Sequence, residues 1–138
     1  MITIKKQEIV KLEDVLHLYQ AVGWTNYTNQ PQMLEQALFH SLVIYLALDG
    51  DAVVGLIRLV GDGFSSVFVQ DLIVLPSYQR QGIGSLLMKE ALKDYKDVYQ
   101  VQLVTEQTER TLGFYRSMGF EILSTYDCTG MIWTNREK

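Results

Sequence analysis

Two spacings of apolar residues alternate along the chain, and they predict helices alternating with strands. Apolar positions at helical spacing predict helices over Lys11–Val22, from Pro31 to about His40, from Gly82 to about Tyr95, and over Thr108–Met118. Shorter apolar runs predict strands at Ile2–Lys6, Val43–Leu48, Val53–Val60, Val67–Leu75, Val98–Val104, Phe120–Tyr126 and Met131–Thr134, the last two as a closing hairpin pair.

Turn residues separate these segments where such boundaries are expected. Gly23 and Gly119 follow helices at C-cap positions, Asp49–Asp51 signals a hairpin turn, and Pro76 ends the long strand. No repeat, low-complexity tract or linker divides the chain. We therefore expect a single α/β (α+β) domain over residues 1–138, with helices on both faces of a mixed sheet.

Composition narrows the class of partner and the compartment. A net charge of −4 argues against nonspecific nucleic-acid binding and suits a cationic small substrate. A lone cysteine, Cys128, excludes a disulfide framework and multi-cysteine zinc sites, and we expect no metal. The N-terminus lacks a secretory h-region, and the longest apolar run, Leu42–Leu48, is far shorter than the ~20 residues that span a bilayer. We expect a soluble cytoplasmic protein without membrane attachment.

The most informative stretch joins a strand to a helix through Gln79-Arg80-Gln81-Gly82-Ile83-Gly84. A helix N-terminus presents unpaired N–H groups and partial positive charge, and it therefore attracts phosphate. Glycine at 82 and 84 removes Cβ atoms that would hold an anion away, and Arg80 adds a full charge. The stretch is not a Walker loop, which ends in Gly-Lys-Ser/Thr, because Gly84 is followed by Ser85 and Leu86. It is not a dinucleotide-binding fingerprint either, because Leu87 stands where that motif has its third glycine.

With its context, the stretch resembles the GNAT superfamily of acetyl-CoA-dependent N-acetyltransferases. Two motifs carry the resemblance, Val74–Gly84 and Phe114–Phe120, in the right order and at about the expected separation. The resemblance implies a mostly antiparallel sheet of six or seven strands, splayed between the fourth and fifth, and acetyl-CoA as co-substrate. It also implies a cofactor-binding set made of Leu72, Ile73, Val74, Gln79, Arg80, Gln81, Gly82, Ile83, Gly84, Ser85 and Thr108.

Within that set, the resemblance implies three tasks. The amides of Arg80–Ser85 would hold the pyrophosphate, and the strand near Leu72–Val74 would pair with the pantetheine arm. A backbone N–H near Val74 would polarise the acetyl carbonyl. Thr108 stands where the family often has asparagine, so its hydroxyl either contacts the cofactor or caps a helix.

The implied catalytic residues are Tyr115 and Asp71. Tyr115 matches the family's usual general acid, which protonates the departing CoA thiolate. The alternative is that Tyr115, like Phe114, is a core aromatic. Asp71 is the one candidate for the general base on its strand, and the alternative is a structural hydrogen-bond partner.

Other chemistry-bearing residues leave alternatives open. Cys128 offers a ping-pong nucleophile, but His17 and His40 belong to the early helices, so an inert thiol is favoured. Trp24 and Tyr27 lie in the loop that borders the acceptor site in this family. They form either an amine-binding wall through cation–π contact or an anchor for that loop.

The favoured function is direct acetyl transfer from acetyl-CoA to a primary amine of a small molecule. Residues Asp71–Gly84 look particularly like arylalkylamine-acetylating relatives. The alternatives are acetylation of a protein N-terminus or lysine, or a non-catalytic acyl-CoA-binding module, which has no need of Tyr115. A homodimer is compatible with the sequence.

Overall fold

The structure of the protein is a computed structural model that describes residues 1–134. It divides into two compact units, Met1–Val104 and a second unit that begins at Thr105, and each is described by itself. The expectation of a single domain over the whole chain stays a prediction. Among the described residues, no helix has both the length and the apolar character that a membrane crossing requires.

The first unit contains five strands at the predicted places and four helices, three of which were predicted. The strands are β1 (Ile2–Gln7), β2 (Val43–Asp49), β3 (Ala52–Gly61), β4 (Ser66–Val74) and β5 (Gln100–Leu103). The helices are α1 (Leu12–Ala21), α2 (Thr25–Thr28), α3 (Pro31–Phe39) and α4 (Ile83–Asp94), with a 3₁₀ turn, η1, at Pro76–Tyr78. The short α2 lies where a loop was expected.

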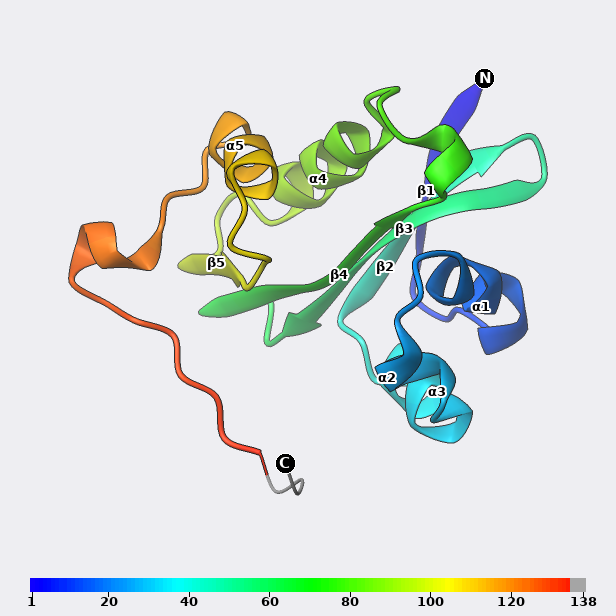
Figure 1. Cartoon of the computed structure of the whole chain (residues 1–138), viewed down its shortest axis with the longest axis horizontal. Helices are drawn as coiled ribbons and strands as arrows, with labels where there is room; N and C mark the ends of the chain where they lie inside the picture. Colours follow the sequence, from blue (N-terminus) through cyan, green and yellow to red (C-terminus); the bar gives the residue numbers. More distant parts are fainter. Residues whose placement is uncertain (135–138) are drawn as a thin grey trace. The chain divides into compact units, whose positions relative to one another are not determined.

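The strands form one sheet in the order β1-β2-β3-β4-β5 (Figure 1). Pairing is antiparallel from β1 to β4, and β4 pairs in parallel with β5. The parallel pairing joins Ser66–Val69 to Gln100–Leu103, so residues 70–74 of β4 continue past the end of β5. The predicted mixed, mostly antiparallel sheet is confirmed. Within Met1–Val104, no strand pairs with the second edge of β4 beyond Val69, and this edge is called the open edge below.

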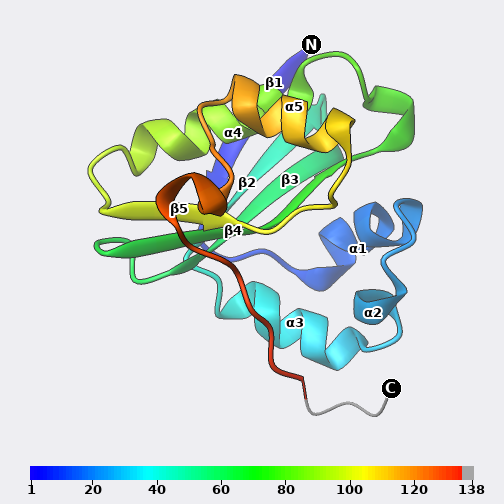
Figure 2. The ribbon, with the colours of Figure 1, turned by 60° about the vertical axis from the view of Figure 1, so that its left-hand side comes forward.

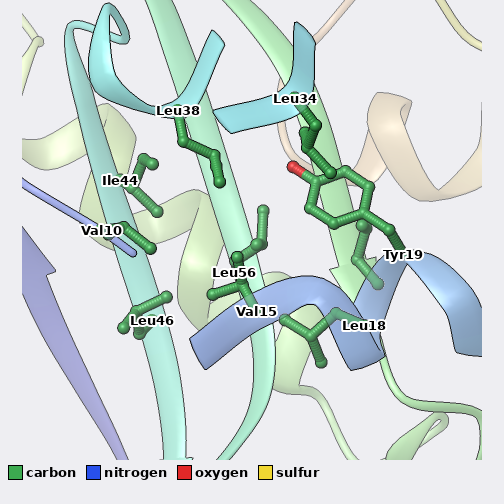
Figure 3. Close-up of a cluster of buried hydrophobic side chains, with 10 residues drawn as sticks. Val10, Val15, Leu18, Tyr19, Leu34, Leu38, Ile44, Leu46 and Leu56 are labelled. Atoms are coloured by element: carbon green, nitrogen blue, oxygen red, sulfur yellow. The ribbon is translucent and has the colours of Figure 1, made fainter. Parts of the chain in front are cut away.

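Helices cover both faces of this sheet, as predicted (Figure 2). On one face, side chains of α1 and α3 pack with alternate residues of β2 and β3 (Figure 3). This core consists of Val10, Val15, Leu18, Tyr19, Leu34, Leu38, Ile44, Leu46, Leu56 and Ile73. The other face is covered by α4, and Gly55 lets Leu87 approach β3 closely because a Cβ there would meet the Leu87 Cδ1 at 3.4 Å.

A β-bulge in β4 decides which residues face which core. Leu59 pairs with Val69, but Arg58 pairs with Asp71, so Gln70 is an extra residue in β4. Directly opposed residues share a face of the sheet. The bulge therefore turns Asp71 toward α1 and α3, whereas Val69 faces the side of α4.

The second unit contains α5 (Glu109–Ser117) and a 3₁₀ turn, η2 (Leu123–Tyr126). The expected strands at Phe120–Tyr126 and Met131–Thr134 are wrong, and the sheet formed by residues 1–134 has five strands instead of six or seven. Local bonds bend the chain in the first segment, where the Thr125 N–H donates to the Ile122 oxygen at 3.0 Å and the Cys128 N–H to the Leu123 oxygen at 3.1 Å. These turn bonds take backbone groups that a strand ladder would need.

Candidate functional site

The open edge of β4 presents main-chain groups of alternate residues. The Leu75 N–H donates to the Val54 oxygen on β3 at 2.9 Å. Because the N–H and C=O of one peptide unit point in opposite directions, the Val74 oxygen points away from β3. Alternation along a strand then turns the N–H and C=O of both Leu72 and Val74 to the open edge.

Ile73, the third residue of this predicted set, faces the other way. Its carbonyl oxygen lies beside Gly55 of β3, 2.9 Å from the position of an added Cβ, and its side chain is buried in the core. The edge therefore offers Leu72 and Val74 to an extended ligand. One acceptor at this edge, the Val74 oxygen, already has a partner, because the Gln79 Nε2 donates to it at 3.1 Å.

The chain then makes a left-handed loop into α4. Arg80 has a φ of 65° and Gly82 a φ of 80°, and Arg80, Gln81 and Gly82 are exposed. The hydrogen-bond ladder of α4 starts with the Leu86 N–H, which donates to the Gly82 oxygen at 3.0 Å. Helix geometry leaves the N–H groups from Gly82 to Ser85 without intrahelical acceptors. Positive helix-end charge, open N–H groups and the nearby Arg80 fit a pyrophosphate.

Gly82 provides the first test of this loop. Alanine at φ 80° costs about 1–2 kcal/mol of backbone strain, although an added Cβ meets no atom within 4 Å. Relaxing that strain would turn the loop amides, so Gly82→Ala should weaken CoA binding about tenfold by isothermal titration calorimetry. Gly23→Ala is the matched control, because Gly23 has a φ of 71° and equal space but lies after α1. Equal CoA affinity in both variants would contradict the role of the loop.

Asp71 lies in a buried polar cluster instead of facing solvent. The Arg58 Nε lies 2.7 Å from the Asp71 Oδ2, and the two residues are 4% and 3% exposed. The Tyr19 hydroxyl donates to the same oxygen at 2.8 Å, and the Tyr27 hydroxyl donates to Oδ1 at 3.0 Å. Burial and the Asp71 charge both raise the pKa of Tyr19, so this phenol stays protonated as a donor.

Arg58 completes the cluster from β3. Its Nη1 donates to the Ala37 oxygen at 3.3 Å and to the Ser41 Oγ at 3.1 Å, and its Nη2 donates to the Tyr27 hydroxyl at 3.2 Å. Burial opposes the charge of Arg58, but Asp71 more than offsets it, and the net result is a raised pKa. The Asp71 carboxylate is therefore fully partnered by protein groups. Its role as general base stays a prediction.

Trp24 and Tyr27 pack on this cluster as a partly buried aromatic pair. Their ring centroids are 6.3 Å apart, and the Tyr27 ring lies 5.1 Å from that of Tyr19. Both side chains contact the core under α1 and α3. They thus anchor α2 to this hydrophobic core, which is one of the two roles expected from the sequence. The amine-binding wall stays a prediction.

In the second unit, Tyr115 is a partly buried phenol with a hydrogen-bond partner. Burial raises the pKa of Tyr115, and a hydrogen bond from Thr105 opposes that shift. Its ring contacts Phe114 and Phe120, with centroids 5.0 and 5.9 Å away. Thr108 caps α5, because its Oγ1 accepts from the Thr111 N–H at 3.2 Å. Cofactor contact by Thr108 stays a prediction.

Comparison with known proteins decides the family. Residues 40–122 match the acetyltransferase (GNAT) domain family, and this segment includes the open edge of β4 and the loop into α4. The chain belongs to the GNAT family of acetyltransferases. The family resemblance recognised in the two motifs is thereby confirmed.

Relatives of this GNAT domain include bacterial and plant proteins. A GNAT-family acetyltransferase of Streptococcus pneumoniae TIGR4 is 86% identical, with a TM-score of 0.91 over 99% of this chain and 100% of that chain. A probable acetyltransferase of unknown function from meticillin-resistant Staphylococcus aureus is 27% identical, with a TM-score of 0.80 over 97% and 99% of the two chains. The chloroplastic serotonin N-acetyltransferase 2 of Oryza sativa subsp. japonica is 35% identical over 66% of this chain and 48% of that protein. The chain thus spans about half the length of the first curated relatives it matches.

The sequence analysis missed three members of the buried cluster around Asp71, namely Arg58, Tyr19 and Ser41. A signal for Arg58 was present, because it is the one charged residue in the apolar run Val53–Val60. A charge inside a buried strand requires a counter-charge, and Asp71 stands on the next strand. Tyr19 gave no such signal, since its position also suits an ordinary core aromatic.

Proposed function

We propose that this protein transfers the acetyl group of acetyl-CoA to a primary amine of a small molecule. The observation that supports it best is the continuous path from the open edge of β4 into the helix N-terminus of α4. An extended amide-bearing chain can pair along that edge, and an anion can bind where the edge ends. Membership of the GNAT family supports the same donor.

Two sets of main-chain groups would bind acetyl-CoA in this proposal. Leu72 and Val74 would pair with the amides of the pantetheine arm, and the N–H groups from Arg80 to Ser85 would bind the pyrophosphate. The Val74 oxygen already accepts from the Gln79 side chain, and the Val74 N–H is the main-chain donor that this residue presents at the open edge. That N–H would stabilise negative charge on the acetyl oxygen during transfer.

Acetyl-CoA supplies a thioester whose carbonyl carbon accepts attack by a neutral amine. The new C–N bond forms as the C–S bond breaks, and the thiolate leaves. In the proposal, the Tyr115 hydroxyl donates its proton to that sulfur. Asp71 is retained as the candidate that accepts the amine proton, and the half-buried Tyr27 hydroxyl, bonded to Asp71 at 3.0 Å, would relay it.

The acceptor in this proposal is a small, cationic and preferably aromatic amine. The similarity to a plant protein named for serotonin supports an arylalkylamine. The net charge of −4 and the aromatic pair Trp24 and Tyr27 support a cation with an apolar body. The cytoplasmic location and the homodimer stay predictions.

The direct test is thiol release from acetyl-CoA with a panel of acceptors. The purified chain is incubated with arylalkylamines, polyamines, aminoglycosides and lysine-containing peptides, and a thiol-reactive dye reports free CoA. Calorimetry with CoA measures donor binding separately. We expect CoA to bind, and we expect free CoA thiol to form from acetyl-CoA when small amines are the acceptors. Release with peptides alone would establish a protein acetyltransferase, and CoA binding without release would establish a binding module.

The pKa of Tyr115 gives a pH prediction. Because burial raises it above the ordinary value of about 10, the phenol keeps its proton throughout the neutral and mildly alkaline range. Alkaline titration followed by phenolate absorbance, with Tyr115→Phe subtracted, should show a midpoint above that value. Thr105→Val should raise the midpoint further, because the Thr105 hydrogen bond lowers the pKa. A midpoint below 10 in the parent protein would contradict the burial of this group.

A further inference from the structure

A hydrogen bond outside the proposed binding groups joins η1 to the β2–β3 turn, just before the loop Arg80–Ser85 that is proposed to bind the pyrophosphate and is called the phosphate loop below. Tyr78, the last residue of η1, donates its hydroxyl to the Asp49 Oδ2 at 2.7 Å. Asp49 is the last residue of β2 and opens the turn to β3. Neither residue belongs to the set expected to touch acetyl-CoA. The contact joins segments 29 positions apart in the chain.

The next residue makes a second attachment in a different direction. Gln79 donates to the Val74 oxygen, so consecutive residues hold the loop to the β2–β3 turn and to the open edge of β4. Arg80 follows at once with a φ of 65°. A left-handed non-glycine residue persists only where the surrounding structure holds it in place. The two attachments lie immediately before that strained residue.

Charge makes the Asp49–Tyr78 bond stronger than a bond between neutral groups. The hydrogen bond to Tyr78 lowers the pKa of Asp49, and the same bond raises the pKa of Tyr78. The carboxylate is therefore ionised and the phenol protonated at neutral pH, which is the pairing that gives charge-assisted hydrogen bonds. The Asp49 side chain is 39% exposed, so solvent screens part of this effect.

We propose that Asp49 and Tyr78 are positioning residues that set the affinity of this protein for acetyl-CoA by fixing the phosphate loop. The inference rests on the proposed function, because it requires the loop from Arg80 to Ser85 to bind the pyrophosphate. Without the bond, η1 can move from the turn, and the amides of the loop lose part of their alignment. Affinity for the donor falls, while the acetyl-transfer step keeps its groups.

The test compares donor affinity with turnover in matched variants. Tyr78→Phe and Asp49→Ala should each raise the Kd of CoA and the KM of acetyl-CoA about three- to tenfold, with kcat within about twofold. Asp49→Asn keeps an acceptor oxygen and should recover most of the affinity. Asp51→Ala, in the same turn, and Tyr99→Phe, at an exposed phenol, are the controls and should bind CoA like the parent protein.

A double variant separates this role from general destabilisation. If the two residues act through one bond, Tyr78→Phe with Asp49→Ala should weaken CoA binding no more than either single change. Additive losses, unchanged affinity in both single variants, or a fall in kcat alone would overturn the inference. A parent protein that binds no CoA by calorimetry would instead overturn the proposed function, so the two failures are distinguishable.

Discussion

Replacing Tyr115 with phenylalanine should lower kcat by about a hundredfold to a thousandfold and leave the KM for acetyl-CoA within about twofold. A positioned general acid contributes about that much to a proton transfer, and phenylalanine preserves the ring while removing the proton. The ring contacts with Phe114 and Phe120 should keep the fold intact. Steady-state kinetics with the best amine from the acceptor panel give both constants.

Tyr126→Phe is the control for this experiment. Tyr126 belongs to the same unit and also has a hydroxyl partner, Glu121, but its side chain is 64% exposed. We expect parent-like kinetics from that variant. If Tyr115→Phe also retains full kcat, the leaving sulfur takes its proton from another source, and the catalytic assignment of Tyr115 is wrong.

Replacing Arg58 with methionine should lower the free energy of unfolding by about 3–5 kcal/mol. The change leaves the Asp71 carboxylate buried at 3% exposure without its counter-charge. For a chain of this size, the loss corresponds to a fall of about 10–20 °C in Tm. Urea denaturation and calorimetry measure the two quantities.

A double variant tests whether the pair acts through charge. Arg58→Met with Asp71→Leu removes both ions, and we expect it to recover much of the stability lost by Arg58→Met alone. A double variant less stable than the single change would contradict that explanation.

Asp71→Asn tests the catalytic role of Asp71, because asparagine still accepts hydrogen bonds but cannot take a proton. If the kcat of Asp71→Asn matches that of the parent protein, Asp71 is a structural residue and not the general base.

The elements that position the proposed donor site could be predicted because their signals are local. Pro76 ends β4, and the spacing of Ile83, Leu87 and Ala91 defines the buried side of α4. The open edge followed from the family resemblance. Its finer geometry, in which Ile73 faces β3 while Leu72 and Val74 face outward, required the Leu75 contact with Val54.

The parts that could not be predicted depend on contacts between distant segments. The Arg58–Asp71 pairing exists only because Gln70 is an extra residue, and a regular hairpin register opposes Arg58 with a different partner. No local pattern in the sequence around Gln70 marks this bulge. The strand expected at Phe120–Tyr126 failed for a related reason. An apolar run shows β propensity, but turn bonds within the run decided its conformation.

The bulge at Gln70 also has a consequence for how this sequence can change over time. On either side of the bulge, Val69 opposes Leu59 on the α4 side of the sheet, whereas Asp71 opposes Arg58 on the α1 side. Loss of one residue between them would exchange those faces for everything that follows. Asp71 would leave Arg58, and Leu72 and Val74 would turn their main-chain groups to β3. The length of β4 between Val69 and Pro76 therefore cannot change by one residue without losing the buried ion pair and the open edge together.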